Sequence, residues 1–218
     1  MGERNLLVEG WGDKGFFSAY CQLLKITNVT ITPKNVNAAT GDGCSNLVAN
    51  LPILLDKIKV GDIDKLGIIL DADYPPDNNG GFVKRRNLIT NKLSSFGYYI
   101  PATCNQGNGE IFTHSDGLPS IGLWIMPNHQ NDGMLEGFIK NLISNSTQVG
   151  LLNHVCSSIK SLPITLFNKD LHLTKAEVST WRAWQKPPGI DLHLALKNGL
   201  LDRAKATNFE KWLTDVFD

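Results

Sequence analysis

The chain has 218 residues, of which 42% are hydrophobic and 19% charged, an ordinary composition for one large domain or a domain with a subdomain. The formal net charge is zero, so charge alone neither favours nor excludes a nucleic-acid partner. No apolar stretch approaches the roughly 20 residues of a membrane span, and the first residues lack the basic and apolar parts of a signal peptide. We therefore expect a cytoplasmic protein without a membrane partner.

The first predicted elements alternate between strands and helices. Residues 6–8 predict a strand that ends at Glu9, and residues 14–24 predict a helix with Asp13 as its N-cap. Residues 29–36 alternate and are rich in β-branched side chains, which predicts a second strand. Pro33 places this strand at a sheet edge or in a bulge.

A tight turn is predicted at residues 41–45, before a helix over residues 46–58 that Pro52 could kink. The next stretch is the most informative one in the chain. The apolar run at residues 66–70 predicts a strand that is buried on both faces of a parallel sheet, and it leads directly into Asp71 and Asp73.

The spacing of Asp71 and Asp73 suggests a metal site. Residues two apart in an extended chain point the same way, so both carboxylates can bind one hard cation, or one can bind while the other acts as a base. The plainer interpretation is that Asp-Ala-Asp only ends the strand before the loop at residues 74–81. Two aspartates at this spacing after a buried strand favour the metal site, because ligands bind beyond the carboxyl ends of such strands.

A helix is predicted over residues 82–96 and ends at Gly97. Its basic run, Lys84, Arg85 and Arg86, forms either a solvated face or a contact for an anionic substrate. The remaining elements of the core are a short strand, a hairpin or mobile loop, a buried strand, and a helix with Glu136 in its first turn. Their predicted ranges are 98–101, 102–119, 121–126 and 134–142.

Beyond residue 144 the pattern predicts helices without strong strands, at residues 149–159, 175–185, 192–197 and 209–217. The chain therefore divides into an α/β core over residues 1–144 and a helical C-terminal section over residues 145–218 that packs on this core. Strands that alternate with helices predict right-handed crossovers and a mostly parallel sheet flanked by helices.

This topology brings the candidate carboxylates together. Glu9 follows the first strand, Asp71 and Asp73 follow the third, and Glu136 comes just after the last. Carboxylates from three separate strand ends would be costly to hold together without a cation. The four cysteines and five histidines are scattered and form no Cys-x-x-Cys or His-x-x-x-His pair, which argues against structural zinc and a disulfide framework.

The layout resembles the TOPRIM domain of topoisomerases, bacterial primases and OLD-family nucleases, which has a Glu-Gly after the first strand and an Asp-x-Asp after the third. These are Glu9-Gly10 and Asp71-Ala-Asp73 here. Residues 7–13 resemble the Val-Glu-Gly-x-x-Asp version seen in small TOPRIM-like proteins. The whole chain is similar to one family of small prokaryotic proteins, which adds a Met-Leu-Glu segment at 134–136 and a Lys-Ala…Trp…Trp-Gln…Pro-Gly segment at 175–189.

The resemblance implies a TOPRIM-like, Rossmann-like fold and a role for each acidic residue. Glu9 would act as general acid or base, or as a metal ligand, while Asp71 and Asp73 would hold Mg²⁺ or Mn²⁺. Asp13 and Glu136 are the candidates for binding a second metal ion.

Lys175 is the candidate for stabilising the phosphate, although it is equally compatible with a plain surface residue. The implied activity is that of a Mg²⁺-dependent nuclease, or a related phosphotransfer enzyme, acting on DNA or RNA. A lone module of this kind could require a partner protein or a second copy of itself.

Two other functions remain open. The first is a non-catalytic module that uses the same acidic edge to bind a metal ion, a nucleotide or a partner. The second is a haloacid-dehalogenase-like phosphatase with Asp71 as nucleophile, which the following Tyr74-Pro75-Pro76 and the position after the third strand disfavour.

The tryptophans allow two interpretations. Trp11 and Trp124 flank the predicted edge, where they could stack on bases, although core packing is the commoner fate of a tryptophan near a strand. Trp181, Trp184 and Trp212 fall on predicted helices and are expected to be packing residues.

Overall fold

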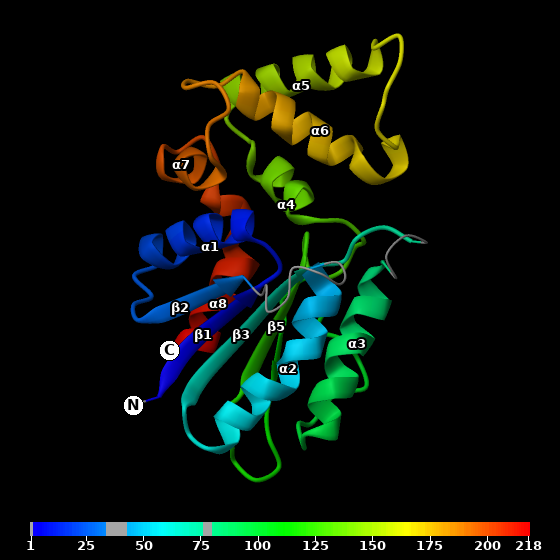
Figure 1. The fold of residues 1–218 in the computed structure, drawn as a ribbon. Coiled ribbons are helices and arrows are strands. Elements are labelled where there is room, and N and C mark those ends of the chain that lie inside the picture. Colours follow the sequence, from blue (N-terminus) through cyan, green and yellow to red (C-terminus); the bar gives the residue numbers. More distant parts are fainter. Residues whose placement is uncertain (1, 34–42, 76–79) are drawn as a thin grey trace.

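A computed structural model describes residues 2–33, 43–75 and 80–218 (Figure 1). A five-stranded sheet in the order β2-β1-β3-β5-β4 forms its centre. The parallel strands are β1 (Glu3–Val8), β2 (Val29–Pro33), β3 (Ile63–Asp71) and β5 (Ile121–Met126). The short strand β4 (Glu110–Phe112) pairs antiparallel with β5. The predicted α/β class with a mostly parallel sheet is confirmed.

Helices cover both faces of this sheet. Their bounds are α1 (Trp11–Leu23), α2 (Gly43–Lys59), α3 (Phe82–Ser95), α4 (Leu135–Leu142), α5 (Ser146–Lys160), α6 (Lys169–Ala183), α7 (Leu192–Lys197) and α8 (Thr207–Phe217), with a 3₁₀ turn, η2 (Arg203–Ala206), before α8. Helices α2 and α3 pack on one face, and α1 and α8 pack on the other (Figure 1).

The strands divide their side chains between two hydrophobic clusters, because successive residues of a strand point to opposite faces. Leu6 and Val8 of β1 join the cluster with α1 and α8, whereas Leu7 joins the cluster with α2 and α3. In β3, Ile69 faces α8 while Ile68 faces α2. The strands are thus buried on both faces, as their continuous apolar runs predict.

The C-terminal helix α8 lies directly against β3 and β5, and two glycines make this approach possible. A Cβ atom on Gly122 would lie 2.2 Å from Cγ2 of Val216, and one on Gly67 would lie 2.9 Å from Cδ1 of Leu6 and 3.3 Å from Cζ of Phe217. A side chain at either position would push α8 off the sheet. The end of the chain is therefore part of the central core.

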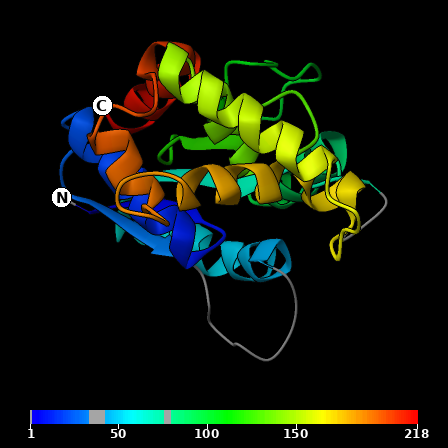
Figure 2. The same cartoon turned by 90° about the horizontal axis from the view of Figure 1, so that it is seen from above.

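Helices α5 and α6 lie side by side beyond the carboxyl ends of the strands (Figures 1 and 2). Val155 of α5 and Trp181 of α6 belong to the same hydrophobic cluster as α1 and α8. The predicted boundary at residue 144 falls between α4 and α5. Helices α5 and α6 of the C-terminal section therefore extend the core above the edge of the sheet where the acidic residues are expected, whereas α8 of the same section packs on the sheet itself.

Several local predictions need correction. Residues 98–101 form no strand, because Tyr98 makes only an isolated bridge to His114. Of the two alternatives for residues 102–119, the structure favours the hairpin over the mobile loop, since β4 lies there and pairs antiparallel with β5. Gly97 follows the C-cap Phe96 with a φ of 91°, so it comes one residue after the cap. The predicted turn at 41–45 overlaps the start of α2.

Strand β2 ends at Pro33 and lies at the edge of the sheet, as Pro33 predicts. The rest of the predicted second strand and the first two residues of the turn fall at residues 34–42, outside the described residues.

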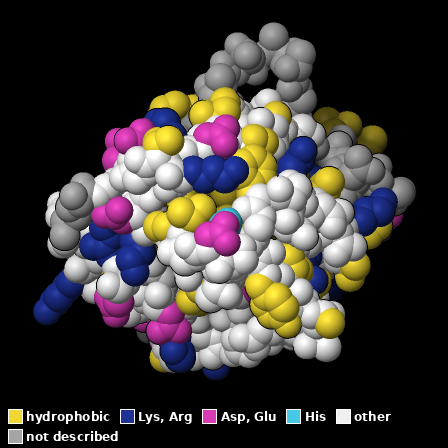
Figure 3. Space-filling model, turned by 90° about the horizontal axis from the view of Figure 1, so that it is seen from below, with side chains coloured by type: hydrophobic (Ala, Val, Ile, Leu, Met, Phe, Trp, Pro, Cys, Tyr) yellow, Lys and Arg dark blue, Asp and Glu magenta, His cyan; other side chains and the backbone are white. Residues whose placement is uncertain are grey.

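Among the described residues, none of the helices combines the length and apolar character needed to cross a membrane. At the face that contains the amino ends of the strands, side chains of Lys and Arg are interspersed with those of Asp and Glu (Figure 3). This mixture agrees with the zero net charge.

Candidate functional site

The predicted acidic residues meet where the order of the strands reverses. Strand β1 lies between β2 and β3, so the chain turns one way after β1 and the other way after β3. This arrangement opens a crevice beyond the carboxyl ends of β1 and β3, which is where ligands bind in open α/β sheets. Glu9 directly follows β1, and Asp71 is the last residue of β3.

Asp71 joins the sheet to helix α4. Its Oδ1 accepts a hydrogen bond of 2.9 Å from the backbone N–H of Leu135, the first residue of α4. Burial raises the pKa of Asp71 well above its usual range, and the charges of Glu9, Asp13, Glu136 and Asp73 raise it further. These interactions show that the predicted carboxylates form one cluster, hereafter the acidic cluster: Glu9, Asp13, Asp71, Asp73 and Glu136.

Glu9 is the least satisfied member of the acidic cluster. Its Oε1 is buried without a hydrogen-bond partner among the described residues. Burial raises the pKa of Glu9 to about 8, with Asp73 and Asp13 adding to the rise and Arg85 opposing it. A buried carboxylate oxygen without a partner is unusual and indicates that a proton or a ligand belongs there.

Asp13 lies in the first turn of α1. The sequence predicts it as the N-cap of this helix, but it does not occupy that position. The N-cap is Gly10, and the Oδ2 of Asp13 accepts a hydrogen bond of 2.9 Å from the Gly10 backbone N–H. Burial raises the pKa of Asp13, and Glu136 also raises it, while Lys175 lowers it. The predicted N-cap is three residues too late, yet Asp13 lies in the first turn of α1 and its carboxylate still faces the cluster.

Asp73 sits in an unusual backbone conformation and carries an ion pair. Its φ is 58°, and its backbone N–H and C=O pair with Gly133 across 2.8 and 3.1 Å. Asparagine and aspartate tolerate this left-handed region better than other residues with a side chain. Its Oδ2 accepts a hydrogen bond from Arg85, so the loop after β3 is fixed at both backbone and side chain.

The sequence interpretation named Arg85 only within the basic run 84–86 and did not foresee its pairing with Asp73. The basic run at 84–86 is not a solvated face, because the Arg85 side chain is only 2% exposed and Arg86 is bound to Glu110. Only Lys84 of the three is exposed. The burial of Arg85 could have been predicted from the helical spacing, since Arg85 shares one face of α3 with the buried Phe82 and Ile89.

Lys175 comes from α6 of the C-terminal section. Its Nζ lies 3.8 Å from Oε1 of Glu136, and its side chain is 59% exposed. A surface ion pair of this length contributes little to stability, so the pair leaves the lysine available to an anion. Both interpretations of Lys175 are therefore compatible with its position.

The acidic cluster supplies ligand atoms of the kind that hard divalent cations use. Its donors are carboxylate oxygens, the ligands that hard divalent cations prefer, and the unpartnered Glu9 Oε1 is one of them. Within the described residues, no three of these carboxylates bring oxygens within 4.8 Å of one another. Mg²⁺ commonly uses one or two carboxylates and fills the rest of its shell with water, so it does not require three close carboxylates.

A second group of polar residues lies near β5. Cys104, Glu110 and His129 place potential ligand atoms within 4.8 Å of one another, which the scattered cysteines and histidines did not reveal. The Nε2 of His129 is 3.2 Å from Oε2 of Glu110, and its Nδ1 accepts a hydrogen bond of 3.0 Å from the Ile125 backbone N–H. The neutral ring therefore carries its proton on Nε2.

This proton arrangement argues against a metal at the second group. A histidine that binds a metal through Nε2 needs a proton on Nδ1 and an acceptor for it, but here Nδ1 faces a donor. Burial and the nearby Glu110 raise the pKa of the Cys104 thiol to about 11, which disfavours the thiolate that a metal requires. We interpret the group as a hydrogen-bond network that anchors the connection between β5 and α4.

The tryptophans separate into buried and exposed residues. Trp124, Trp181 and Trp212 are buried, so Trp124 packs in the core rather than on the exposed edge. Trp184 is 43% exposed and its ring centroid lies 5.6 Å from that of His154, so it packs at the surface rather than in the core. Trp11 is 64% exposed beside the acidic cluster, with Nζ of Lys14 at 5.3 Å from its ring centroid, and base stacking there stays a prediction.

The fold and the acidic cluster define an α/β protein with a carboxylate site at the switch point of a mostly parallel sheet. A family described as "Protein of unknown function (DUF3226)" matches residues 3–218, and the chain belongs to this family. A search of curated proteins and a search of solved structures each found no match.

Proposed function

We propose that this protein is a metal-dependent nuclease with a TOPRIM-like site, and that it hydrolyses phosphodiester bonds at the acidic cluster. The observation that carries the proposal is the buried, unpartnered Oε1 of Glu9 among four further carboxylates at the switch point. Such a set is electrostatically unfavourable alone and is relieved by a divalent cation. The Glu-Gly and Asp-x-Asp positions of the TOPRIM resemblance coincide with the members Glu9, Asp71 and Asp73.

The residues divide the chemistry among them. A Mg²⁺ or Mn²⁺ ion held by Asp71 and Asp73 would activate water and relieve charge on the leaving oxygen. Glu9 is suited to proton transfer, because a pKa of about 8 lets its Oε1 hold or release a proton near neutral pH. Arg85, through Asp73, and Lys175, through Glu136, bring positive charge to the cluster, and the exposed Lys175 is the one that a phosphate would reach.

One observation favours a second candidate function, a non-catalytic module that binds a metal ion, a nucleotide or a partner. The guanidinium of Arg85 is bound to Asp73 and partly neutralises the cluster without any metal. Because Arg85 already offsets part of the negative charge, the site needs a metal cation less than a set of carboxylates without an arginine would.

A cleavage assay separates the two functions. Plasmid, single-stranded DNA and single-stranded RNA are incubated with the protein in Mg²⁺, in Mn²⁺ and in EDTA. The nuclease proposal predicts cleavage of at least one substrate that requires the metal and is absent in Asp71→Ala/Asp73→Ala prepared in parallel, which controls for contaminating nucleases. Intact substrates in every condition, with metal binding retained, would contradict the nuclease and favour the binding module.

A further inference from the structure

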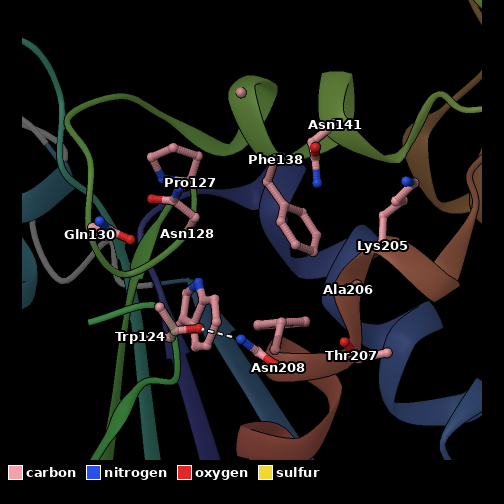
Figure 4. A pocket seen from close by; sticks show the side chains of 13 residues that line it. Trp124, Pro127, Asn128, Gln130, Phe138, Asn141, Lys205, Ala206, Thr207 and Asn208 are labelled. Carbon is pink, nitrogen blue, oxygen red and sulfur yellow. Dashed lines mark hydrogen bonds between the residues drawn. The ribbon is translucent and has the colours of Figure 1, made fainter. Parts of the chain in front are cut away.

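A second site lies on the other side of helix α4. A cavity of about 380 Å³ opens between the segment after β5, helix α4 and the start of α8 (Figure 4). This volume is in the range of small-molecule sites, which are concave and carry a few polar groups on an apolar base. The residues used below come from all three elements and from the loop before β4.

The floor of the cavity is aromatic. The rings of Trp124 and Phe209 meet edge to face with centroids 5.2 Å apart, and Phe138 meets Phe209 in the same way at 5.2 Å. In Figure 4 the Trp124 indole lies at the bottom of the cavity and the Phe138 ring lines its wall. These residues are only 1–5% exposed, so small parts of the rings reach the cavity, and the surrounding core holds them in place.

One polar atom on this floor is unsatisfied. The indole Nε1 of Trp124 is buried without a hydrogen-bond partner among the described residues, although the residue is only 2% exposed. In Figure 4 this nitrogen lies on the side of the ring that faces Pro127 and Asn128, which line the cavity. Buried donors nearly always have a partner, so a ligand atom that accepts a hydrogen bond belongs above it.

The rim supplies the remaining recognition groups. Side-chain amides of Asn128, Gln130 and Asn141 surround the opening, and each offers both donors and an acceptor. Asn208 joins this rim while its Nδ2 donates to the Gly107 carbonyl across 3.0 Å. Lys205 is the charged residue of the lining, and no carboxylate is among the described residues that line it.

We propose that this cavity binds a nucleobase of a single-stranded nucleic acid whose backbone reaches the acidic cluster; this extension rests on the proposed nuclease function. A base has ring nitrogens or carbonyls for Trp124 Nε1, polar edges for the amides, and apolar ring atoms for the small part of the floor that the cavity leaves open. Lys205 would contact a backbone phosphate. The cavity would therefore select strands in which a base can leave the stack.

The first turn of α4 connects the two sites. The backbone N–H of Leu135 binds Asp71, Glu136 belongs to the acidic cluster, and Gly137 and Phe138 line the cavity. Gly137 is held against Pro127, since a Cβ there would be 3.2 Å from the proline Cβ. One rigid turn thus separates the bound base from the phosphodiester that would be cleaved.

The proposal is tested by binding in EDTA, where no metal contributes. The probe is a short fluorescent single-stranded oligonucleotide, compared by anisotropy with the same strand in which the bases are replaced by abasic sites. Wild-type protein is expected to prefer the intact strand by about tenfold, because two or so hydrogen bonds to a recognised base contribute roughly that factor. Asn141→Phe, which fills the mouth of the cavity from an exposed position, removes the preference, and Asn153→Phe on α5 is the matched control.

Trp124→Phe tests the unpartnered donor. It keeps an aromatic ring in the floor and removes the N–H, so binding of the intact strand is expected to weaken several-fold while the abasic strand is unaffected. Lys205→Glu is expected to weaken both strands equally, with Lys169→Glu on the exposed start of α6 as its control. Equal binding of intact and abasic strands to wild type would overturn the proposal.

Competition with AMP distinguishes a strand from a free nucleotide. The proposal predicts that AMP displaces the oligonucleotide only at much higher concentration than unlabelled strand does. Tighter binding of AMP than of the strand would show that the cavity binds a free nucleotide. It would overturn the proposal that the cavity binds a base of a single strand. Metal-dependent cleavage without any base preference would refute only the cavity, whereas base preference without cleavage would refute only the nuclease.

Discussion

Replacing Glu9 by glutamine is expected to lower metal-dependent cleavage by roughly 10²–10⁴-fold while the fold stays intact, because general acid–base catalysis contributes about that much. Glutamine has nearly the same shape but cannot exchange a proton at the position of Oε1, the unpartnered atom of the cluster. The measurement is the initial rate of cleavage under saturating Mn²⁺, with circular dichroism to verify the fold. Glu3→Gln, at the exposed start of the same strand, is the matched control.

Glu9→Gln is also expected to change how the stability of the metal-free protein depends on pH. The folded protein raises the pKa of Glu9 to about 8 from 4.5, so it favours the protonated form more than the unfolded chain does. The stability associated with this proton is fully present below pH 4.5 and is lost as the pH rises through about 8. In EDTA, Glu9→Gln should therefore melt above wild type past pH 8 and approach it near pH 5. Full cleavage activity of Glu9→Gln, or the same pH dependence of the melting temperature for the variant and wild type, would show that Glu9 does not have the proposed role.

Glu110→Ala is expected to lower the free energy of unfolding by about 3–5 kcal/mol, the usual cost of leaving a buried charge without its partner. Glu110 accepts hydrogen bonds of 2.8 and 2.6 Å from Arg86, and both side chains are largely buried. Burial alone would raise the pKa of Glu110, but hydrogen bonds from Arg86 and His129 hold it at about 2. The stability it contributes is present above pH 4.5 and is lost as the pH falls through about 2.

Chemical denaturation at neutral pH measures this cost. Glu210→Ala is the matched control, because Glu210 pairs with the more exposed Arg203 and should cost only about 0–1 kcal/mol. The double variant Arg86→Met/Glu110→Leu removes both charges and should be less destabilised than Glu110→Ala. A cost below about 1 kcal/mol for Glu110→Ala would show that the network does not anchor the connection between β5 and α4.

The sequence was sufficient for the parts of the site that local pattern determines. The apolar run before Asp71 defined β3, and the alternation of strands and helices implied a parallel sheet with its carboxylates at one edge. Asp13 was placed in the right turn but in the wrong role, because Gly10 adopts the extended N-cap backbone and aspartate also suits the first turn.

The remaining features depend on contacts between distant segments. Arg85 pairs with Asp73 inside the protein, which a basic run alone does not reveal. Its helical spacing from Phe82 indicates only that Arg85 lies on the buried face of α3. Glu110 and His129 meet only through the pairing of β4 with β5. Trp124 was expected to be buried, but no sequence pattern shows that its indole N–H lacks a partner.

The central claim is that the acidic cluster binds a divalent cation, and calorimetric titration of Mn²⁺ and Mg²⁺ tests it most directly. The titration is performed above pH 8, where Glu9 is ionised, on wild type and on Asp71→Ala/Asp73→Ala. The account predicts saturable binding to wild type and none to the double variant. No binding to wild type at millimolar metal, or the same isotherm for both proteins, would contradict it.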